Sequence, residues 1–474
     1  MTSSVKPYRT IYNMDSSGIL LDSTDTDDYL RGIVGFLEHS HVDALFWMDG
    51  AGGNTANYDS AVLELTGHST GAVHPLLMKM IEEGNDPPTI VVREAKRYGV
   101  DVFFSMRLND CHDSLGHDHL VATFKQRHPE WTIGRGHIYG GHQNLNFAIP
   151  EVRELKLAAV KEICRKYDFD GLEIDFMRSP PYFMPGEEMA NAHILTEFLR
   201  CVRRHVDQRA RDRGRPMWLA ARVDESLEAC AQDGFQVNTW VDERLIDILT
   251  MGSGTIDVQV EAFKALTEGT GIRIYPCLYG WPSKYMPLSS EMARALAVNY
   301  WYQGADGLYT FNWNAHSHAH RPRKNAKWAY QHALLRELGD PETLRGKNKR
   351  FAADRGRPTR VYPHNWVDCV LPVSLEAGVG GGAWVDIPIM VGEEFTRASE
   401  PKAVELHIDC EELTEDDHLA IKLNWQDVGA PQRSGGRISV PVNSRELKRG
   451  RNQVQVSVDT GTATIIAVEM DVTY

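Results

Sequence analysis

The sequence lacks several features that define broad classes of protein. It has no run of about 18 apolar residues, so a membrane-spanning helix is not expected. The first six residues hold no apolar core of the kind that a secretory signal needs, and we expect a cytoplasmic protein, or a secreted one whose leader was removed. The net charge of −14 disfavours nucleic acid as the main partner, because phosphate binding needs a basic surface.

Cysteine is scarce and scattered. The chain has seven cysteines, an odd number, and no two of them form a CxxC pair that would suggest structural zinc. Three of them, Cys164, Cys201 and Cys277, fall in segments expected to be helices or strands. We therefore expect free thiols in a reducing compartment, and no resident metal or other cofactor.

Eight short apolar segments, each ending in polar or aromatic residues, occupy the first two thirds of the chain. They are Arg9–Asp15, Val42–Gly50, Val100–Asp110, Phe169–Arg178, Met217–Glu225, Ile246–Gly252, Arg273–Trp281 and Ala305–Asn314. Helix-like stretches separate them, which is the pattern of parallel βα units. Eight such units close into a (β/α)₈ TIM barrel, whose reactive groups lie at the C-terminal ends of its strands. We expect an α/β barrel over residues 1–345.

Residues 346–474 follow a different pattern. Strand-like segments separated by turn residues replace the alternation of strand and helix, and no helix of comparable strength lies between them. These segments are Trp384–Val391, Ala403–Ile408, Leu419–Asn424, Gln453–Val458 and Ala463–Val472. The pattern predicts a second domain, a small antiparallel β-sandwich.

The fourth barrel segment carries the strongest chemical signal. Alternation along a strand places Glu173 and Asp175 on the inner face, with Asp175 nearer the open end. That position favours a reactive role for Asp175. Glu173 could instead pair with a barrel arginine, such as Arg107 or Arg222, and fill the core.

The fifth segment supplies possible partners for Asp175. Arg222 and Asp224 share its inner face, and Glu225 follows. Neighbouring strands would bring Asp175 and Asp224 within roughly 5–10 Å, the range of paired glycosidase carboxylates. Such a pair needs one protonated and one ionised acid, and Arg178 or Arg222 could hold the charge of the second. Alternatively, Asp224 could cap the helix expected from Ser226.

Aromatic and polar side chains end most of the other segments. A flat apolar ring beside polar groups suits a pyranose, which has an apolar face and a rim of hydroxyls. The candidate substrate contacts are Asp15, Trp47, Asp49, Arg107, Asn109, His142, Asn144, Arg178, Arg222, Tyr279, Trp281, Asn312 and Trp313. We expect the long excursion of residues 108–149 to fold over the mouth and contribute His142, with Trp131 or Asn144. Any single one of these residues could instead be core packing.

Two histidine-rich stretches leave a metal-dependent reaction open. Residues 117–119 and 316–320 carry histidines at alternate positions, which can reach one ion. Metal-dependent barrel hydrolases tend to carry an HxH pair on the first strand, where this chain has Tyr12-Asn13-Met14. A metal-dependent sugar isomerase or lyase that uses Glu173, Asp175 and histidines stays an alternative.

Residues 144–154 and 167–176 resemble the glycosyl-hydrolase-like barrel families of the glycoside hydrolase superfamily. Those families begin a helix with N-P-E-V-R and carry Y-D-x-D-G-x-x-x-D on strand four. Here Ile149 stands in place of the asparagine before Pro150, and the second motif runs from Tyr167 to Asp175. The resemblance implies a barrel that hydrolyses O-glycosidic bonds, with carbohydrate as its partner. Similarity to α-glycoside-cleaving barrels implies that Asp175 attacks and that Asp224 or Glu225 protonates.

The same strand is also similar to the chitinase-type sequence D-G-x-D-x-D-x-E. Glu173 and Asp175 occupy its two inner aspartate positions, but Met177 stands in place of the catalytic glutamate. This departure argues against chitinase-type, substrate-assisted catalysis. It also leaves open a non-catalytic barrel that binds carbohydrate without cleaving it.

Overall fold

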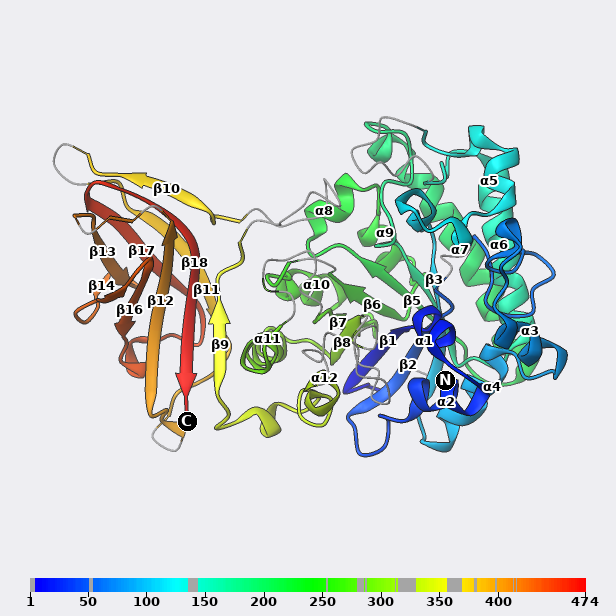
Figure 1. Ribbon diagram of the computed structural model, residues 1–474, viewed down its shortest axis with the longest axis horizontal. Helices are drawn as coiled ribbons and strands as arrows, with labels where there is room; N and C mark the ends of the chain where they lie inside the picture. The colour runs from blue at the N-terminus through cyan, green and yellow to red at the C-terminus, as the bar shows by residue number, and fades with distance from the viewer. Residues whose placement is uncertain are drawn as a thin grey trace.

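The structure is a computed structural model. It describes residues 5–50, 54–134, 144–252, 255–278, 285, 288–311, 313, 330–355, 369–378, 382–396, 399–411, 413–414 and 416–474. Figure 1 shows a barrel ringed by helices, with a separate all-β domain beside it.

Eight parallel strands form the barrel. They are β1 (Thr10–Asp15), β2 (Val42–Met48), β3 (Asp101–Arg107), β4 (Gly171–Asp175), β5 (Trp218–Val223), β6 (Ile248–Met251), β7 (Arg273–Pro276) and β8 (Leu308–Phe311). They are hydrogen-bonded in the order β7-β6-β5-β4-β3-β2-β1-β8. A parallel bridge between Cys277 and Tyr309 joins the two ends of this order. The predicted (β/α)₈ barrel is confirmed.

Helices follow the strands and cover the outside of the barrel (Figure 1). The α-helices are α1 (Ser17–Asp22), α2 (Thr26–Val34), α3 (Pro75–Glu82), α4 (Pro87–Arg97), α5 (Thr123–Arg127), α6 (Pro150–Lys166), α7 (Glu188–Arg213), α8 (Leu227–Gln232), α9 (Val237–Asp242), α10 (Val260–Thr267), α11 (Ser290–Tyr302) and α12 (Tyr330–Leu334). Short 3₁₀ helices are η1 (His68–Thr70), η2 (His112–Leu115), η3 (Asp118–Leu120), η4 (Pro129–Trp131), η6 (Pro341–Leu344) and η8 (Ser444–Glu446).

Local sequence explains where several helices begin. Proline occupies the first position of α6, where its missing N–H costs nothing. The side chain of Asp25 accepts a hydrogen bond from the backbone N–H of Asp28 and caps α2. Ser226 caps α8 in the same way by accepting from Ala229, so the alternative in which Asp224 is the cap is wrong.

Alternation along the strands separates two apolar layers. The inner layer fills the barrel and includes Phe46, Phe103, Tyr275 and Tyr309. The outer layer lies between strands and helices and includes Tyr12, Leu45, Trp47 and Leu172. Gly171 of β4 belongs to the tight part of the inner layer, because a Cβ atom there would lie 2.1 Å from the ring of Phe103.

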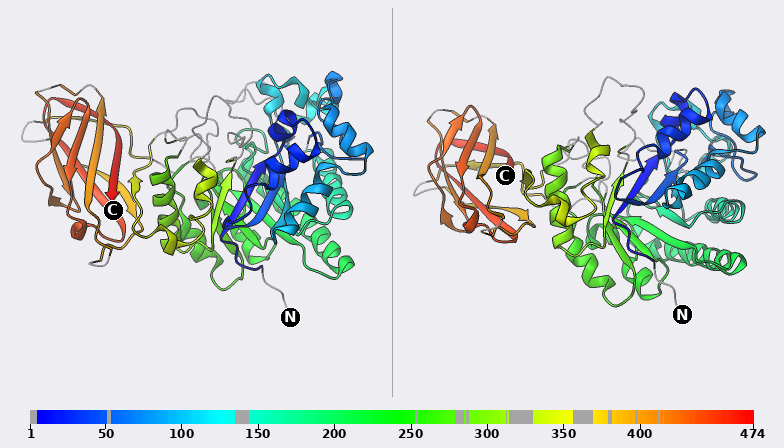
Figure 2. Two further views of the ribbon diagram at one scale, coloured as in Figure 1. Left: turned by 60° about the horizontal axis from the view of Figure 1, so that its bottom comes forward. Right: turned by 90° about the horizontal axis from the view of Figure 1, so that it is seen from below.

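The C-terminal residues form two antiparallel sheets that face each other (Figure 2). Their strands are β9 (Lys349–Ala352), β10 (Val373–Glu376), β11 (Val385–Val391), β12 (Ala403–Glu411), β13 (His418–Leu423), β14 (Gln426–Asp427), β15 (Gln432–Ser434), β16 (Arg437–Pro441), β17 (Gly450–Thr460) and β18 (Thr462–Thr473). One sheet has the order β10-β18-β12-β16-β15, with β9 paired to β18, and the other has β11-β17-β13-β14. This is the predicted antiparallel sandwich.

The sandwich packs against helix α11 of the barrel. The side chain of Asn299 on α11 donates to the carbonyl of Met390 and accepts from the backbone N–H of Gly392. Ala295 of the same helix belongs to the apolar core of the sandwich. Strand β9, which begins at Lys349, pairs with the last strand of the chain. The boundary between residues 345 and 346 stays a prediction.

Two findings concern the chain as a whole. No helix within the described ranges is long and apolar enough to cross a membrane. Cys111, Cys164, Cys230, Cys277 and Cys410 are buried and form no disulfide bond.

We predict that Gly171→Ala destabilises the barrel. The new methyl group must displace the ring of Phe103, which is itself stacked on Phe46 at 4.3 Å. Such overpacking costs about 1–3 kcal/mol, which urea unfolding would measure. Gly18→Ala is the matched control, since a Cβ atom there meets nothing within 4 Å. Equal unfolding midpoints for the two variants would contradict the prediction.

Candidate active site

Glu173 lies in the middle of the barrel, below the open end. Four side chains from four other strands lie within hydrogen-bonding distance of its carboxyl group, at 2.5–3.2 Å: Asn13, Ser105, Thr250 and Tyr309. Burial, and then the neighbouring Asp175, raise the pKa of Glu173 to about 7. A protonated Glu173 can donate to Thr250, whose hydroxyl lies 3.3 Å from the carbonyl of Ala221. The residue therefore belongs to a closed polar layer of hydroxyls and one amide.

Asp175 lies one layer higher, at the end of β4, and faces Arg222. The guanidinium donates to its carboxylate at 3.2 Å, and both side chains are fully buried. The backbone N–H of Met177 donates to the other oxygen at 3.0 Å. Arg222 also donates to the carbonyl of Gly252 and lies 3.9 Å from the ring centre of Phe311. The arginine supplies the positive charge that a buried carboxylate requires.

A second arginine flanks Asp175 on the other side. In the sheet, Arg107 of β3 is the register partner of Asp175 on one side, and Arg222 of β5 is its register partner on the other side. Its guanidinium donates to Asp15 at 2.6 Å. Burial raises the pKa of Asp15, but Arg107 and the hydroxyl of Ser17 outweigh this effect and lower it below its usual value. The two predicted contacts Asp15 and Arg107 thus form an ion pair beside Asp175.

A third cluster of charged side chains lies at this end, and only one of its members, Arg178, was predicted as a site residue. Asp110 follows β3, and its carboxylate lies 2.6 Å from Nδ1 of His112. Arg178 approaches Nε2 of His112 at 3.3 Å and Asp110 at 3.6 Å. Burial raises the pKa of Asp110, but His112, Arg107 and Arg178 together hold it well below its usual range. Asp110 closes the third apolar segment of the sequence, so the rule that selected the other strand-end residues would also have found it.

Asp224 and Glu225 are both fully buried after β5. Glu225 accepts a hydrogen bond from the backbone N–H of Thr255 at 3.1 Å. Its Cγ lies 3.6 Å from the position that a Cβ on Gly252 would take, and the Cβ of Cys277 lies 3.8 Å from the same point. Glu225 thus reaches the β6 and β7 side of the barrel end.

Two buried cysteines have pKa values that these acids help to raise. Burial and then Asp224 raise the pKa of Cys230, which lies on α8 in the outer layer, and Glu225 adds to this effect. Burial raises the pKa of Cys277, inside the barrel, to about 12; Arg222 opposes this, whereas Asp175 and Glu225 add to it.

Several predicted substrate contacts have buried side chains that contact other residues of the fold. Trp47 lies in the outer layer, where its N–H donates to Tyr29 and its ring packs near Phe104. Alternation on β2 places Phe46 and Met48 inside instead, so the structure does not bring Trp47 to the mouth. Trp313 is buried and donates to the carbonyl of Leu278.

Asn109 and Asn144 connect the long excursion to the loop after β4. Asn109 donates to the carbonyls of Leu145 and Pro181, and Asn144 donates to that of Ser179. Trp131 stacks on His128 at 4.3 Å within the excursion. Asp49 is buried at the end of β2. The remaining predicted contacts, His142, Tyr279, Trp281 and Asn312, lie outside the described residues.

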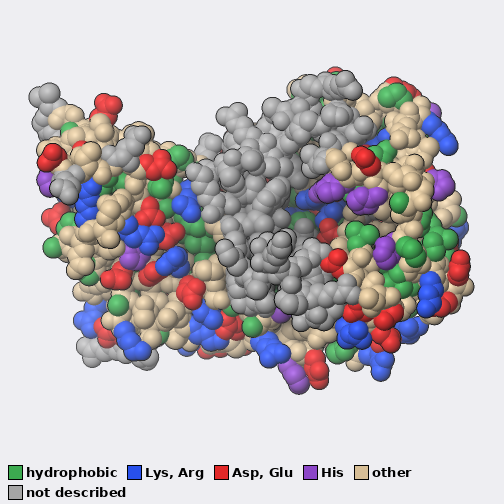
Figure 3. All heavy atoms as spheres, in the orientation of Figure 1, with side chains coloured by type: hydrophobic (Ala, Val, Ile, Leu, Met, Phe, Trp, Pro, Cys, Tyr) green, Lys and Arg blue, Asp and Glu red, His purple; other side chains and the backbone are tan. Residues whose placement is uncertain are grey.

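Two further observations concern the surroundings of these side chains. Within the described ranges, no three His, Cys, Asp or Glu side chains form a group that could hold a metal ion. In the space-filling view, histidine, basic and acidic side chains lie close together on this face of the barrel domain (Figure 3).

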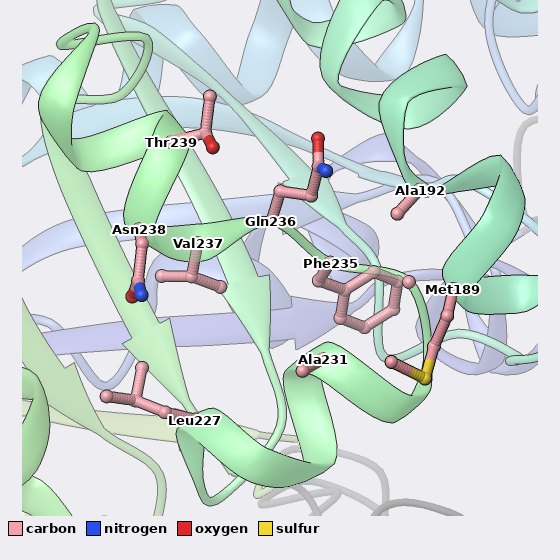
Figure 4. Close-up of a pocket in the computed structure, with 10 residues that line it drawn as sticks. Met189, Ala192, Leu227, Ala231, Phe235, Gln236, Val237, Asn238 and Thr239 are labelled. Carbon is pink, nitrogen blue, oxygen red and sulfur yellow. The ribbon is translucent and has the colours of Figure 1, made fainter.

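A separate cavity of about 300 Å³ lies between α7, α8 and α9, outside the barrel (Figure 4). Met189, Leu227 and Phe235 contribute to its largely apolar wall. None of its lining residues carries a charge, so it offers none of the titratable groups that acid–base chemistry requires.

Comparison with known proteins adds a likeness of fold. No family model matches the chain, and no curated protein matches it. Among solved structures it is similar to the glycoside hydrolase domain of PgaB (BpsB) from Bordetella bronchiseptica, at 12% identity and a TM-score of 0.49, covering 70% of this chain and 99% of that one. It is also similar to α-L-fucosidase isoenzyme 2 from Paenibacillus thiaminolyticus, at 14% identity and a TM-score of 0.42, covering 73% of this chain and 51% of that one.

A third similar structure is the GH36 α-galactosidase AgaA from Geobacillus stearothermophilus. The identity is 10% and the TM-score 0.36, with 94% of this chain and 55% of the galactosidase chain covered. This chain thus spans about half the length of the fucosidase and of the galactosidase.

We predict that Glu173→Gln stabilises the protein above neutral pH. The folded state keeps the proton of Glu173 up to about pH 7, whereas the unfolded chain releases it near the ordinary value of 4.5. Stability therefore falls as pH rises through this window, because the native state binds more protons. Glutamine keeps the hydrogen bonds and cannot ionise. Its free energy of unfolding should exceed that of the wild type by about 1 kcal/mol or more at about pH 8, and the gap should close towards about pH 4.

Urea unfolding across this pH range measures the effect. Glu376→Gln, at an exposed position on β10, is the matched control and should show no such dependence on pH. A constant difference between Glu173→Gln and the wild type at every pH would show that ionisation of Glu173 is not its source.

Proposed function

We propose that this chain is a glycoside hydrolase that cleaves the O-glycosidic bond of a short saccharide at the C-terminal end of its barrel. The proposal is carried by one observation: Asp175 is a buried carboxylate with its charge matched by Arg222, and two further buried acids follow the next strand. Hydrolysis of a glycoside needs one ionised acid and one that holds a proton.

Asp175 takes the role of the ionised group. It attacks the anomeric carbon or holds the water that does so, and Arg222 and the N–H of Met177 keep its two oxygens in place. The proton for the leaving oxygen comes from Asp224 or Glu225. The position of Glu225 beside Gly252 and Cys277 supports Glu225, whereas alternation along β5 supports Asp224.

The charged side chains around Asp175 suit the hydroxyl groups of a sugar. Asp15 is the more exposed member of its pair with Arg107, with 19% of its side chain accessible. His112, with 31% accessible, is held by Asp110 and Arg178. Carboxylate acceptors and guanidinium donors together can bind hydroxyls in either direction.

Asp175→Asn should abolish hydrolysis under conditions in which the protein is still folded, although loss of the charge that matches Arg222 should lower its free energy of unfolding. Removal of a nucleophile or of the base that holds water commonly costs several orders of magnitude in rate. A panel of aryl glycosides of both anomers measures the activity, and circular dichroism measures the fold. Asp212→Asn, at an exposed position on α7, is the matched control and should keep full activity.

Two outcomes would contradict these assignments. Turnover above about a tenth of the wild-type rate, a cost under about 1.4 kcal/mol, would remove Asp175 from the reaction. A wild-type protein that binds saccharides but hydrolyses none of the panel would instead be a carbohydrate-binding barrel. Met177 is consistent with that second function, because it fills the chitinase-type glutamate position with a side chain of the apolar core.

The acid is identified by its dependence on the leaving group. Substrates with good leaving groups need little protonation, so loss of the acid should leave an activated aryl glycoside nearly unaffected and cripple an alkyl glycoside. We expect this pattern for either Asp224→Ala or Glu225→Gln, and we expect the other variant to lose activity on both substrates to a similar extent. Steady-state kinetics on the two substrates measures the ratio. Equal losses on both substrates for both variants would mean that the proton comes from elsewhere.

A further inference from the structure

Tryptophan is exposed on one sheet of the C-terminal sandwich. Trp384 and Trp425 are the exposed tryptophans of the described residues, with 39% and 60% of their surface accessible. Trp384 directly precedes β11, and Trp425 lies in the turn between β13 and β14. Both positions belong to the sheet β11-β17-β13-β14.

Trp384 and the turn that carries Trp425 lie at the same outer face of this sheet. Asp386, Gln455 and Lys422 are register partners across β11, β17 and β13, so their side chains share one face. Trp384 lies two residues before Asp386 on that face, and the ammonium group of Lys422 lies 5.2 Å from its ring centre. The backbone N–H of Trp425 donates to the side chain of Gln455 at 2.9 Å, which joins the turn to the same row.

A buried amide holds the polar row in place. Gln455 is fully buried, and its side-chain N–H donates to the carboxylate of Asp386 at 2.9 Å. One side chain therefore positions both the turn that carries Trp425 and the exposed Asp386. Lys422 is half-buried and lies 3.5 Å from Asp427. The outer face thus offers a fixed carboxylate and an ammonium group, with Trp384 on the same face and Trp425 in the adjoining turn.

The backbone of the turn does not favour tryptophan. Leu423 pairs with Gln426, so Asn424 and Trp425 form a two-residue hairpin turn, and their φ angles are +52° and +67°. Turns with two positive φ angles favour Asn-Gly, and a bulky side chain in this region is strained. Glycine would serve the turn better. The indole of Trp425 therefore requires an explanation other than local structure, and such exceptions are typical of functional positions.

We propose that this face binds a polysaccharide, with sugar rings stacked on Trp384 and Trp425 and hydroxyls hydrogen-bonded to Asp386 and Lys422. An indole gives a flat apolar surface for one face of a pyranose, and the polar row supplies both an acceptor and a donor. Single-stranded nucleic acid also stacks on aromatic rings, but it needs a basic groove, and here acidic and basic groups alternate in a chain of net charge −14. A protein partner would favour a continuous apolar centre, which the charged row interrupts.

The choice of a saccharide rests on the proposed function of the barrel, and the face is a second site on the other domain. Retention of the full-length protein on insoluble cellulose, chitin, mannan and starch tests it. We expect the wild type to be retained on at least one of these, and Trp384→Ala and Trp425→Gly each to weaken that retention about tenfold or more. Trp425→Gly should also keep or raise the melting temperature, which separates lost binding from lost folding. Tyr98→Ala removes an aromatic ring of 45% exposure from the barrel and should change nothing.

The test separates failure of this face from failure of the barrel chemistry. Both tryptophan variants should hydrolyse small aryl glycosides at the wild-type rate. If the wild type hydrolyses none of them but retention still depends on the two tryptophans, the proposed hydrolase fails and the binding face stands. No retention of the wild type, or equal retention of the variants, overturns the binding face. A dimer that dissociates on Trp425→Gly without any polysaccharide binding would make a second copy of the chain the occupant, and would also overturn it.

Discussion

The ion pair between Asp175 and Arg222 is the constraint on which the open end of the barrel depends. Burying a carboxylate without a matching charge costs several kcal/mol, and both of these side chains are fully buried. The strand register offsets this cost, because it places Asp175 between Arg107 of β3 and Arg222 of β5. Each arginine pairs with a carboxylate, Arg107 with Asp15 and Arg222 with Asp175. The ion pair of Asp175 therefore depends on the neighbouring strand β5 as much as on β4.

Among the described residues, Glu173, two residues earlier on the same strand, is buried without an arginine partner. The hydrogen-bond partners of Glu173 are hydroxyls and an amide, with no arginine among them. The layer below the ion pairs therefore holds a carboxyl group whose pKa is raised to about 7. Beneath this layer the stacked rings of Phe46 and Phe103 fill the barrel. The surroundings of the two acids on this face of β4 thus change from hydroxyls and an amide at Glu173 to a guanidinium at Asp175.

Sequence periodicity was sufficient for the barrel, for the sandwich and for the inner face of β4. It was not sufficient for residues whose role depends on contacts between distant segments. Trp47 ends a strand, but it lies on the outer face, where Tyr29 and Phe104 hold it. The group formed by Asp110, His112 and Arg178 joins the ends of two strands, and no spacing along the chain reveals it. The same limit applies to Glu225, whose approach to Gly252 and Cys277 depends on how the chain leaves β5.

The two domains carry exceptions of different kinds. In the barrel, the unusual residues are the buried ion pairs and the buried acid Glu173, and their partners within the fold account for them. In the sandwich, the unusual residue is a bulky one at a left-handed turn position: the ring of Trp425 is 60% exposed, and its hydrogen bond to Gln455 comes from the backbone. A strained and exposed indole lowers the stability of the free protein, and such local strain is typical of positions that serve a function.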